Sequence, residues 1–137
     1  MNKIFVLFFC LLLSGCAATM SQVTAPNRKN LLKLVISMPK EEALNVMGTK
    51  SFMAGGFDFF EFKRVTETVV TNPYRSEILQ GKDKTLEVIY YVTDVKRNDN
   101  AVTDDELTPL VFDNGKLIGW GWSFLQDNAQ KYEIRIR

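Results

Sequence analysis

The side chains that most often carry catalysis are scarce in this chain. It contains no histidine, and its two cysteines, Cys10 and Cys16, both lie near the N-terminus. Because histidine is the commonest general base and metal ligand, most hydrolase schemes lack a partner here. Ser123 follows Gly121-Trp122 but lacks the second glycine and the histidine partner of a nucleophile elbow. We therefore expect no enzyme, no catalytic residues and no cofactor.

Acidic side chains gather in residues 94–106 (DVKRNDNAVTDDE), which invites a test for calcium binding. If Asp94 begins an EF-hand loop, Asp99 falls at the sixth position, where glycine is required. A start at Asn98 also fails, since an apolar residue then occupies a ligand position. The segment from Thr103 to Glu106 instead matches a capping box that opens one helical turn. We expect no metal site.

Cys16 ends the apolar N-terminal stretch, and its surroundings indicate what becomes of its thiol. After a start with one basic residue, residues 4–13 form an apolar run that is too short to span a bilayer. The segment Leu13-Ser14-Gly15-Cys16 resembles the lipobox of bacterial lipoproteins. Two alternatives are an ordinary secretory signal with a chance cysteine and an N-terminal core helix.

The lipobox resemblance implies cleavage between Gly15 and Cys16, a diacylglycerol on the Cys16 thiol and acylation of the freed amine. It also implies that Ala17 favours delivery to the outer membrane, with the protein facing the periplasm. Two or more acyl chains anchor a protein stably. We accordingly expect a removed signal peptide at 1–15, a lipidated cysteine and flexible tether at 16–27, and a single domain at 28–137.

Charge and cysteine usage narrow the partners of that domain. The full chain has a net charge of +1, and Lys3 lies in the segment expected to be removed, so the mature chain is neutral. A neutral chain lacks the basic footprint of a nucleic-acid-binding protein. Cys10 leaves with the signal and Cys16 is lipidated, so no disulfide is expected and core packing must stabilise the fold.

Two short amphipathic helices are predicted at the start of the domain. Asn27 can cap a helix over residues 28–36. Its apolar stripe consists of Leu31, Leu32, Val35 and Ile36. Pro39 suits the first turn of a second helix over residues 39–47, and Gly48 suits a left-handed stop.

The second predicted helix carries a family resemblance. Residues 36–48 (ISMPKEEALNVMG) resemble the helix-to-strand signature of the small outer-membrane lipoproteins of the SmpA/OmlA (BamE-like) group. The resemblance implies an α+β fold in which two helices pack on an antiparallel sheet as two layers.

Strand patterns fill the rest of the domain. After a break at Gly55-Gly56, residues 57–70 are rich in aromatic and β-branched side chains, which predicts one long strand. Asn72-Pro73 marks a turn, after which residues 74–79 can pair with residues 86–93. At the C-terminus, Tyr132, Ile134 and Ile136 alternate with charged residues, which predicts either an edge strand or a frayed tail.

Asn114-Gly115 predicts a type I′ turn in a hairpin over residues 108–122. An ideal register then pairs Asp113 with Lys116, Val111 with Ile118 and Pro109 with Trp120. The opposite side, together with one side of the preceding strand, forms a candidate interaction surface that consists of Leu110, Phe112, Leu117, Gly119, Gly121, Ile89 and Tyr91. The alternative is that Trp120 and Trp122 are core residues beneath the two helices.

Three further segments are similar to those of uncharacterised small proteobacterial lipoproteins, a resemblance that implies no activity. They are Asn72-Pro73-Tyr74, Asp105-Glu106-Leu107-Thr108-Pro109, and residues 115–122 (GKLIGWGW).

These observations predict a non-catalytic, lipid-anchored protein of the outer membrane. It would act as an interaction or scaffold module in envelope assembly or maintenance, with the membrane and an envelope protein as partners and no nucleic acid. The alternative is a binder of a small apolar or glycan ligand in a pocket lined by Tyr90, Tyr91, Trp120 and Trp122.

Overall fold

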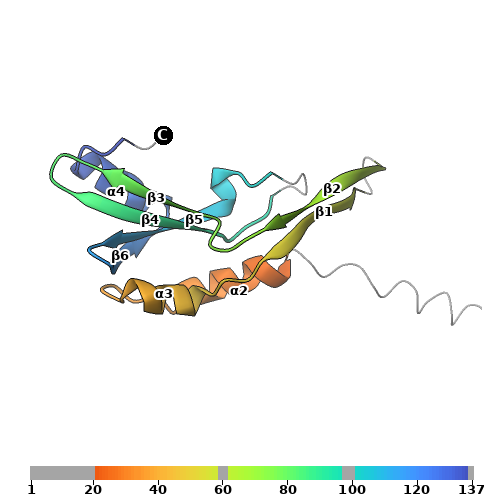
Figure 1. The fold of residues 1–137 in the computed structure, drawn as a ribbon, viewed down its shortest axis with the longest axis horizontal. Coiled ribbons are helices and arrows are strands. Elements are labelled where there is room, and N and C mark those ends of the chain that lie inside the picture. Colours follow the sequence, from red (N-terminus) through yellow and green to blue (C-terminus); the bar gives the residue numbers. More distant parts are fainter. Residues whose placement is uncertain (1–20, 59–61, 97–100, 136–137) are drawn as a thin grey trace, which may run out of the picture.

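The computed structural model describes residues 21–58, 62–96 and 101–135, which form an α+β domain (Figure 1). This confirms the expected fold class. In chain order the elements are α2 (Ser21–Leu31), α3 (Lys40–Met47), β1 (Phe52–Asp58), β2 (Lys63–Val70), β3 (Arg75–Gln80), β4 (Thr85–Val92), the 3-10 turn η1 (Asp104–Glu106), β5 (Leu107–Asp113), β6 (Lys116–Trp120) and α4 (Trp122–Lys131). None of the helices in the described ranges has the length and apolar content to cross a bilayer.

The centre of the domain is an antiparallel sheet with the strand order β3-β4-β5-β6. From Val88 to Val92, strand β4 is apolar on both faces and every side chain is buried. Tyr90 lies on one face of the sheet and Tyr91 on the other, and neither side chain is exposed. A strand buried on both faces requires a cover on each side of the sheet.

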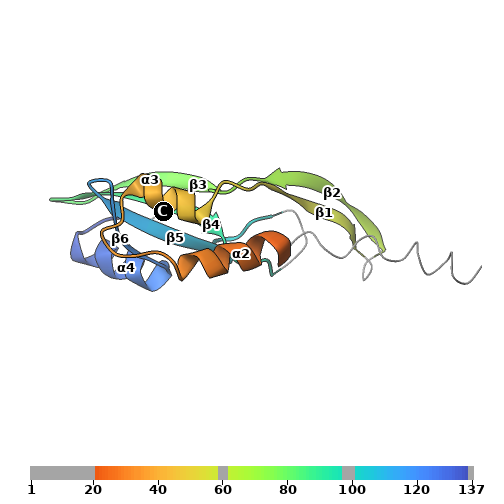
Figure 2. The ribbon, with the colours of Figure 1, turned by 90° about the horizontal axis from the view of Figure 1, so that it is seen from below.

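Helices α2 and α3 cover one face, as the sequence predicts, and α4 covers the opposite face (Figures 1 and 2). The helix-pair cluster comprises Leu34, Ala43, Met47, Ile89, Tyr91, Leu110, Phe112 and Leu117. The α4 cluster includes Leu86, Val88, Tyr90, Val92, Leu107, Val111, Leu125 and Ala129. The sheet is thus the middle layer, with α4 on the face for which no helix was predicted.

Helix α3 forms as its sequence predicts. Pro39 is the N-cap, Glu41 and Glu42 lie in the first turn near the positive end of the helix dipole, and Met47 ends the helix. Gly48 then adopts φ 77°, and its N–H donates to Leu44 O at 2.7 Å. The left-handed backbone explains why glycine follows this helix.

The prediction for the first helix was wrong at both ends. Helix α2 begins at Ser21, inside the expected tether, and ends at Leu31. Asn27 is therefore no cap: it lies within the helix, and its side-chain amide reaches the sheet by donating to Val92 O at 2.7 Å. Of the expected apolar stripe, Leu31 packs against the core, whereas Leu32, Val35 and Ile36 follow the helix and are exposed. Leu34, which was not part of the predicted stripe, is buried.

The connection between the two helices protects one edge of the sheet. Ser37 N–H donates to Leu117 O at 2.8 Å, and Leu117 N–H donates to Met38 O at 2.9 Å. Pro39 forms a further antiparallel bridge with Lys116. This pairing satisfies the outer edge of β6, which would otherwise offer unpaired backbone groups to other chains.

The prediction of one long strand over residues 57–70 was wrong: residues 57–58 end β1, residues 63–70 form β2, and the two strands pair as a hairpin. The two strands form a sheet of their own, separate from the four-stranded sheet. Gly55, expected to break the chain, lies within β1 at φ 105°, where the register shifts between Ala54 and Gly56. A bulge, rather than a chain break, explains a glycine at this position.

The Asn114-Gly115 turn forms as predicted, with positive φ at both residues and Asp113 paired with Lys116. Beyond that pair the predicted register was wrong. Val111 pairs with Gly119 and Leu110 with Trp120, so Ile118 is an extra residue on β6. A bulge of one residue exchanges the faces of all that follows. Trp120 consequently packs against the helix-pair cluster.

The C-terminal segment corrects a further prediction. Residues 122–131 form α4, whose Leu125 and Ala129 pack on the sheet. Beyond the helix, Ile134 N–H donates to Ala129 O at 2.8 Å, and the Ile134 side chain is buried in the α4 cluster. Residues 132–135 are thus neither an edge strand nor a frayed tail, and Ile136 lies outside the described residues.

We predict that Gly119→Ala destabilises the domain by about 1–3 kcal/mol because the added methyl group overpacks the interface with α4. A Cβ atom at this position would lie 2.5 Å from the Phe124 ring. Combining it with Phe124→Leu should remove most of that penalty, since the smaller side chain makes room. Urea unfolding of the two single variants and the double variant measures the coupling, and purely additive effects would contradict the proposed contact.

Candidate functional site

The predicted interaction surface is not a surface. Its members Ile89, Tyr91, Leu110, Phe112 and Leu117 all belong to the helix-pair cluster and are at most 5% exposed. The same apolar face that suggested docking is filled by helices of the chain itself. The expectation of an open sheet face was therefore wrong.

The two glycines of that predicted surface have other roles. Because of the bulge in β6, Gly119 faces the Phe124 ring of α4 on the opposite side of the sheet. Gly121 is the N-cap of α4, and its φ of 91° lies in the range that favours glycine. Both glycines therefore serve the packing of α4.

The four aromatic residues of the alternative ligand pocket do not line one cavity. Tyr91 and Trp120 lie with the helix-pair cluster, whereas Tyr90 and Trp122 lie with the α4 cluster. The latter two rings are in contact, with centroids 5.8 Å apart. The structure thus joins the four predicted residues only as two pairs on opposite faces.

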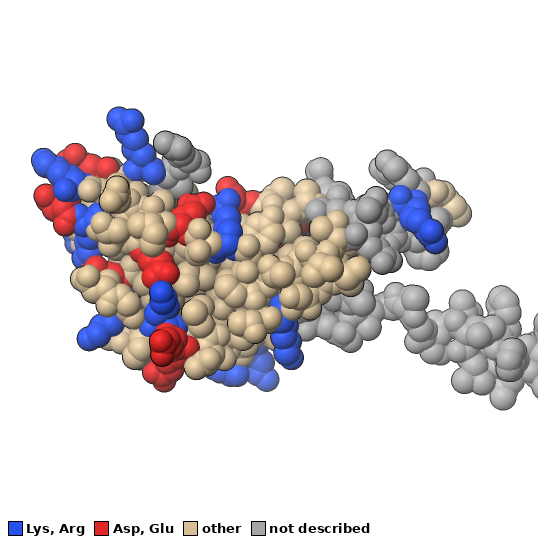
Figure 3. Space-filling view, viewed as in Figure 1, with Lys and Arg blue, Asp and Glu red and all other residues tan. Residues whose placement is uncertain are grey.

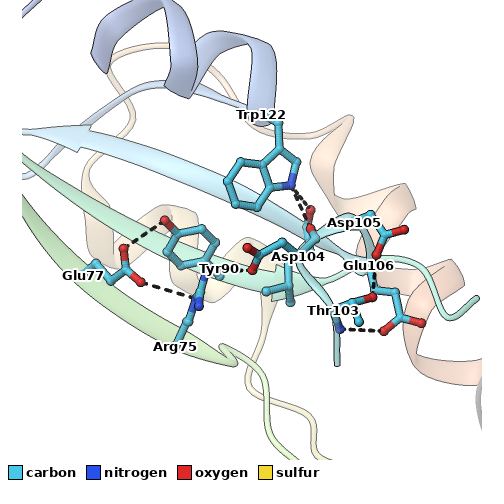
Figure 4. Close-up of polar contacts among 9 residues, drawn as sticks. Arg75, Glu77, Tyr90, Thr103, Asp104, Asp105, Glu106 and Trp122 are labelled. Atoms are coloured by element: carbon cyan, nitrogen blue, oxygen red, sulfur yellow. Dashed lines mark hydrogen bonds and ion pairs between the residues drawn. The ribbon is translucent and has the colours of Figure 1, made fainter. Parts of the chain in front are cut away.

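Polar side chains do converge at one place, which we name the Arg75 cluster: Arg75, Glu77, Tyr90, Asp104 and Trp122 (Figure 4). The Arg75 guanidinium lies 4.3 Å above the centroid of the Tyr90 ring, and its Nη2 contacts Asp104 Oδ1 at 2.9 Å. Arg75 Nε lies 3.6 Å from Glu77 Oε1, an ion-pair distance. The cluster therefore ties the edge strand β3 to the turn η1.

The two remaining members of the Arg75 cluster complete this connection. Tyr90 donates its hydroxyl proton to Glu77 Oε2 at 3.2 Å. The Trp122 indole donates to Leu107 O at 2.8 Å and to Asp104 O at 3.0 Å (Figure 4). Trp122 thus connects the start of α4 to the start of β5, while its ring packs on Tyr90.

The protonation of Tyr90 argues against acid–base chemistry in the Arg75 cluster. Burial, together with the neighbouring negative charge of Glu77, raises the pKa of Tyr90 to about 12. The phenol is therefore neutral near pH 7 and serves as a hydrogen-bond donor. Within the described residues, no group of three or more His, Cys, Asp or Glu side chains is arranged to hold a metal ion.

The polar loop before β5 forms the predicted capping box. Thr103 N–H donates to Glu106 Oε2 at 3.0 Å, and Lys96 N–H donates to Glu106 Oε1 at 2.6 Å. Glu106 itself is buried, and it holds the loop against the end of β4. The acidic residues here thus order the backbone around η1.

The last residue of β4 is held by two asparagines from distant parts of the chain. Val92 N–H donates to Asn72 Oδ1 at 2.9 Å, and Val92 O accepts from Asn27 Nδ2 at 2.7 Å. Both asparagines are buried. Side-chain amides here replace strand partners, because β3 pairs with β4 only from Thr85 to Tyr90 and leaves the edge of Val92 without a strand.

The three segments singled out in the sequence therefore act at the same end of the sheet. Asn72 binds the end of β4, Glu106 caps the turn that leads into β5, and Trp122 bonds the backbone on both sides of that turn. The spacing of these segments gave no sign of this convergence. Arg75 and Asp104, separated by 29 residues, carried no local signal at all.

Apolar side chains remain outside the core in two groups, and Tyr74 and Ile78, beside and on β3, are exposed as well. The connector patch, between α2 and α3, consists of Leu32, Val35 and Ile36, which are 87%, 62% and 54% exposed. On the β1–β2 hairpin, the paired residues Met53 and Val69 are 45% and 59% exposed, and Phe62, which precedes β2, is 81% exposed. On the face seen in Figure 3, charged side chains gather around α3 and α4, and the area that leads to the hairpin is largely uncharged.

The fold and these sites define a small α+β domain in which helices cover both faces of the central strands and polar clusters organise loops. Residues 17–127 match the family described as "Protein of unknown function (DUF3192)", and the chain belongs to this family. No curated protein and no solved structure matches the chain. The predicted cleavage and lipidation residues, Gly15 and Cys16, lie outside the described residues.

We predict that the two neighbouring tyrosines respond oppositely to the loss of their hydroxyl groups. Tyr91 Oη is buried and has no hydrogen-bond partner among the described residues, so Tyr91→Phe should stabilise the domain by about 1 kcal/mol. Tyr90→Phe loses the bond to Glu77 and should destabilise it by a similar amount. Urea unfolding near pH 7 measures both changes, and the same sign for both would refute the assignment.

We also predict a tyrosine-dependent loss of stability at alkaline pH. Burial raises the pKa of Tyr91 from its ordinary value of 10.0 to about 12. Between these values the unfolded chain loses the proton and the folded chain keeps it, so the free energy of unfolding falls as pH rises. The stabilisation is complete below about pH 10. Comparison of wild type with Tyr91→Phe across this window isolates the effect, and parallel pH profiles would exclude it.

Proposed function

We propose that this protein is a lipid-anchored lipoprotein of the outer membrane, facing the periplasm, which acts by binding rather than by catalysis. The observation that carries the proposal is Leu13-Ser14-Gly15-Cys16 at the end of a ten-residue apolar run. Its proposed role is an interaction or scaffold module in envelope assembly or maintenance. Acyl chains on Cys16 would hold the module at the membrane.

The distribution of apolar side chains supports a binding role. Both faces of β4 and β5 are filled from within the chain, whereas Ile78 on the edge strand β3 is 63% exposed. A partner must therefore use the edge of the sheet or surface outside it. The connector patch offers three large aliphatic side chains within five residues, although Leu34 between them is buried. Exposed apolar groups concentrated in this way are typical of protein-binding sites.

Charge around the connector patch indicates the kind of partner. Arg28, Lys29 and Lys33 precede or flank the patch and are exposed. Arg28 Nη1 lies 3.9 Å from Asp94 Oδ1, and Lys33 Nζ donates to Asn30 Oδ1 at 2.9 Å. A basic rim around an apolar patch favours an envelope protein with an apolar surface bordered by acidic side chains.

The anchor is tested by Cys16→Ala. Wild type should incorporate labelled palmitate and fractionate with the outer membrane, whereas the variant should lose the label because it lacks the acylated thiol. Ser123→Ala, an exposed change in α4, serves as the matched control and should behave as wild type. Retention of label and of outer-membrane location by Cys16→Ala would overturn the anchor.

The binding role is tested by a photoreactive side chain at position 32. In intact cells it should give a discrete adduct with one envelope protein, and Val35→Glu should abolish that adduct by placing a charge in the patch. The same photoreactive group at Gln126, exposed on α4, should give no such adduct. Equal labelling from both positions, or an adduct insensitive to Val35→Glu, would contradict the connector patch as the binding site.

A further inference from the structure

The two edges of the four-stranded sheet differ in what covers them. The strand order β3-β4-β5-β6 makes β3 and β6 the edge strands. The connection between α2 and α3 covers the edge of β6, where Ser37 N–H donates to Leu117 O and Pro39 forms a bridge with Lys116. Among the described residues, no strand pairs with the outer edge of β3, which lies at the border of the domain in Figure 2. One edge of the sheet is thus closed, and the other is open.

The ladder between β3 and β4 determines which backbone groups of β3 point outward. Gly81 N–H donates to Lys84 O at 2.8 Å, so these two residues form a hydrogen-bonded pair. In an antiparallel ladder such pairs recur at every second residue, and Leu79 and Glu77 therefore bond the backbone of β4. The intervening residues of β3 direct their N–H and C=O groups toward the open edge. They are Ser76, Ile78 and Gln80.

The side chains of the same three residues favour the addition of a strand. Ser76 pairs with Ile89 of the helix-pair cluster, so the three side chains lie on the face that α2 and α3 cover. Ile78 is nevertheless 63% exposed, and Ser76 and Gln80 are exposed as well. Natural edge strands usually carry a lysine, a proline or a bulge that opposes pairing with other chains. An exposed isoleucine within β3 promotes such pairing instead.

A second copy of the chain is complementary to this edge. In an antiparallel pair centred on Ile78, this residue lies opposite Ile78 of the second copy, and Ser76 lies opposite Gln80. The pair then joins two exposed apolar side chains and places a hydroxyl group opposite an amide. A register centred on Glu77 would instead oppose two carboxylates, and one centred on Leu79 would place Ile78 opposite Gln80. The register centred on Ile78 is therefore favoured.

The charges of the chain do not oppose this contact. Arg75 Nε lies 3.6 Å from Glu77 Oε1, so the two charged residues of β3 compensate each other. In the favoured register they lie opposite Gly81 and Leu79 of the second copy, and no like charges face each other. The full chain has a net charge of +1, so long-range repulsion between two copies is small.

The closed edge of β6 limits this assembly to two copies. Pairing of β3 with β3 about a two-fold axis uses the same edge of both copies, which makes the contact isologous. The product is one continuous sheet with four strands from each copy. Its outer edges are the two β6 strands, and the connection between α2 and α3 covers both. The dimer therefore offers no described open edge for further growth.

From these observations we infer that two copies of the chain associate through antiparallel pairing of their β3 strands, centred on Ile78. The occupant of the open edge is the second copy. The inference goes beyond the proposed function and does not depend on the anchor at Cys16. The connector patch lies beside the covered edge of β6, because Ile36 directly precedes Ser37, and the dimer leaves it accessible.

The test measures which positions of β3 meet in the dimer. One version of the full chain carries Ser76→Cys, another carries Gln80→Cys, and cells that express both are treated with a mild oxidant. In the favoured register these two positions form a hydrogen-bonded pair with Cα atoms about 5.5 Å apart, a distance that a disulfide spans. Two copies of the same position lie four residues out of register, about 13 Å along the strand, which is too far for a disulfide.

Mass spectrometry of tryptic peptides identifies the products. Residues 76–82 form one peptide in each version, because they follow Arg75 and end at Lys82. This peptide contains neither Cys10 nor Cys16, so the result is independent of the proposed lipidation. We expect the mixed disulfide between positions 76 and 80 to exceed each like disulfide several-fold beyond the statistical ratio of random encounter.

A charge at the centre of the pair tests the role of Ile78. Introduced into both versions, Ile78→Glu should return the mixed disulfide to the statistical ratio, because two carboxylates then lie opposite each other. Gln126→Glu, an exposed change on α4, adds the same charge as a matched control and should leave the excess unchanged. Ile78 is exposed, so both variants should remain folded, and urea unfolding checks this.

The other outcomes contradict the dimer or its register. A statistical ratio in the two parent versions would overturn the inference, and an excess of a like disulfide would show a different register. Disulfides that join the 76–82 peptide to another protein would show that an unlike strand occupies the edge, which also overturns the inference. A mixed excess that persists with Ile78→Glu would exclude Ile78 as the centre of the contact.

Discussion

The burial of strand β4 on both faces is the constraint on which the rest of the domain depends. Tyr90 and Tyr91 follow each other in sequence, so their rings must enter different clusters. Each cluster needs its own helical cover, and the chain supplies α2 and α3 on one side and α4 on the other (Figure 2). The end of β4 then lies between elements from both ends of the chain, where Asn27 and Asn72 bind the backbone of Val92.

This central position of β4 explains why polar residues gather at one end of the sheet. Where β3 stops pairing with β4, backbone groups still need partners, and a buried unpaired group costs about 1–3 kcal/mol. The side chains of Asn27 and Asn72 meet that need at Val92, and Glu106 does the same for Thr103 and Lys96 in the neighbouring loop. Sequence segments that invite a functional interpretation thus serve the architecture, and function is left to the exposed surface.

The sequence was a good guide wherever a local rule decides the structure. The helix between Pro39 and Gly48, the Asn114-Gly115 turn and the capping box at Thr103 each depend on contacts within a few residues, and each was predicted correctly. The hairpin at residues 52–70 was predicted incorrectly because Gly55, which was expected to break the chain, lies at a bulge within β1.

Predictions failed where packing between distant segments decides the structure. Asn27 has a high propensity for the cap position of a helix. In the structure it lies inside α2 instead, and its side chain bonds the backbone of Val92. One extra residue at Ile118 exchanged the faces of Gly119 and Trp120, and no local pattern marks that bulge. The candidate interaction surface was wrong for the same reason. Alternating apolar residues show that a face of a sheet is covered, but they do not show which segment covers it. In contrast, the exposure of Phe62 and Leu32 follows from the backbone path alone, which the sequence does not reveal.

The proposed anchor changes what a weak apolar contact can achieve. Burial of one large aliphatic side chain contributes about 1.5–3 kcal/mol, too little to hold a free domain on a partner. Once acyl chains hold Cys16, the connector patch and a membrane-bound partner would meet on one bilayer, so their effective concentration is high and the same small free energy can decide binding. Three exposed side chains, Leu32, Val35 and Ile36, can therefore suffice for a tethered protein.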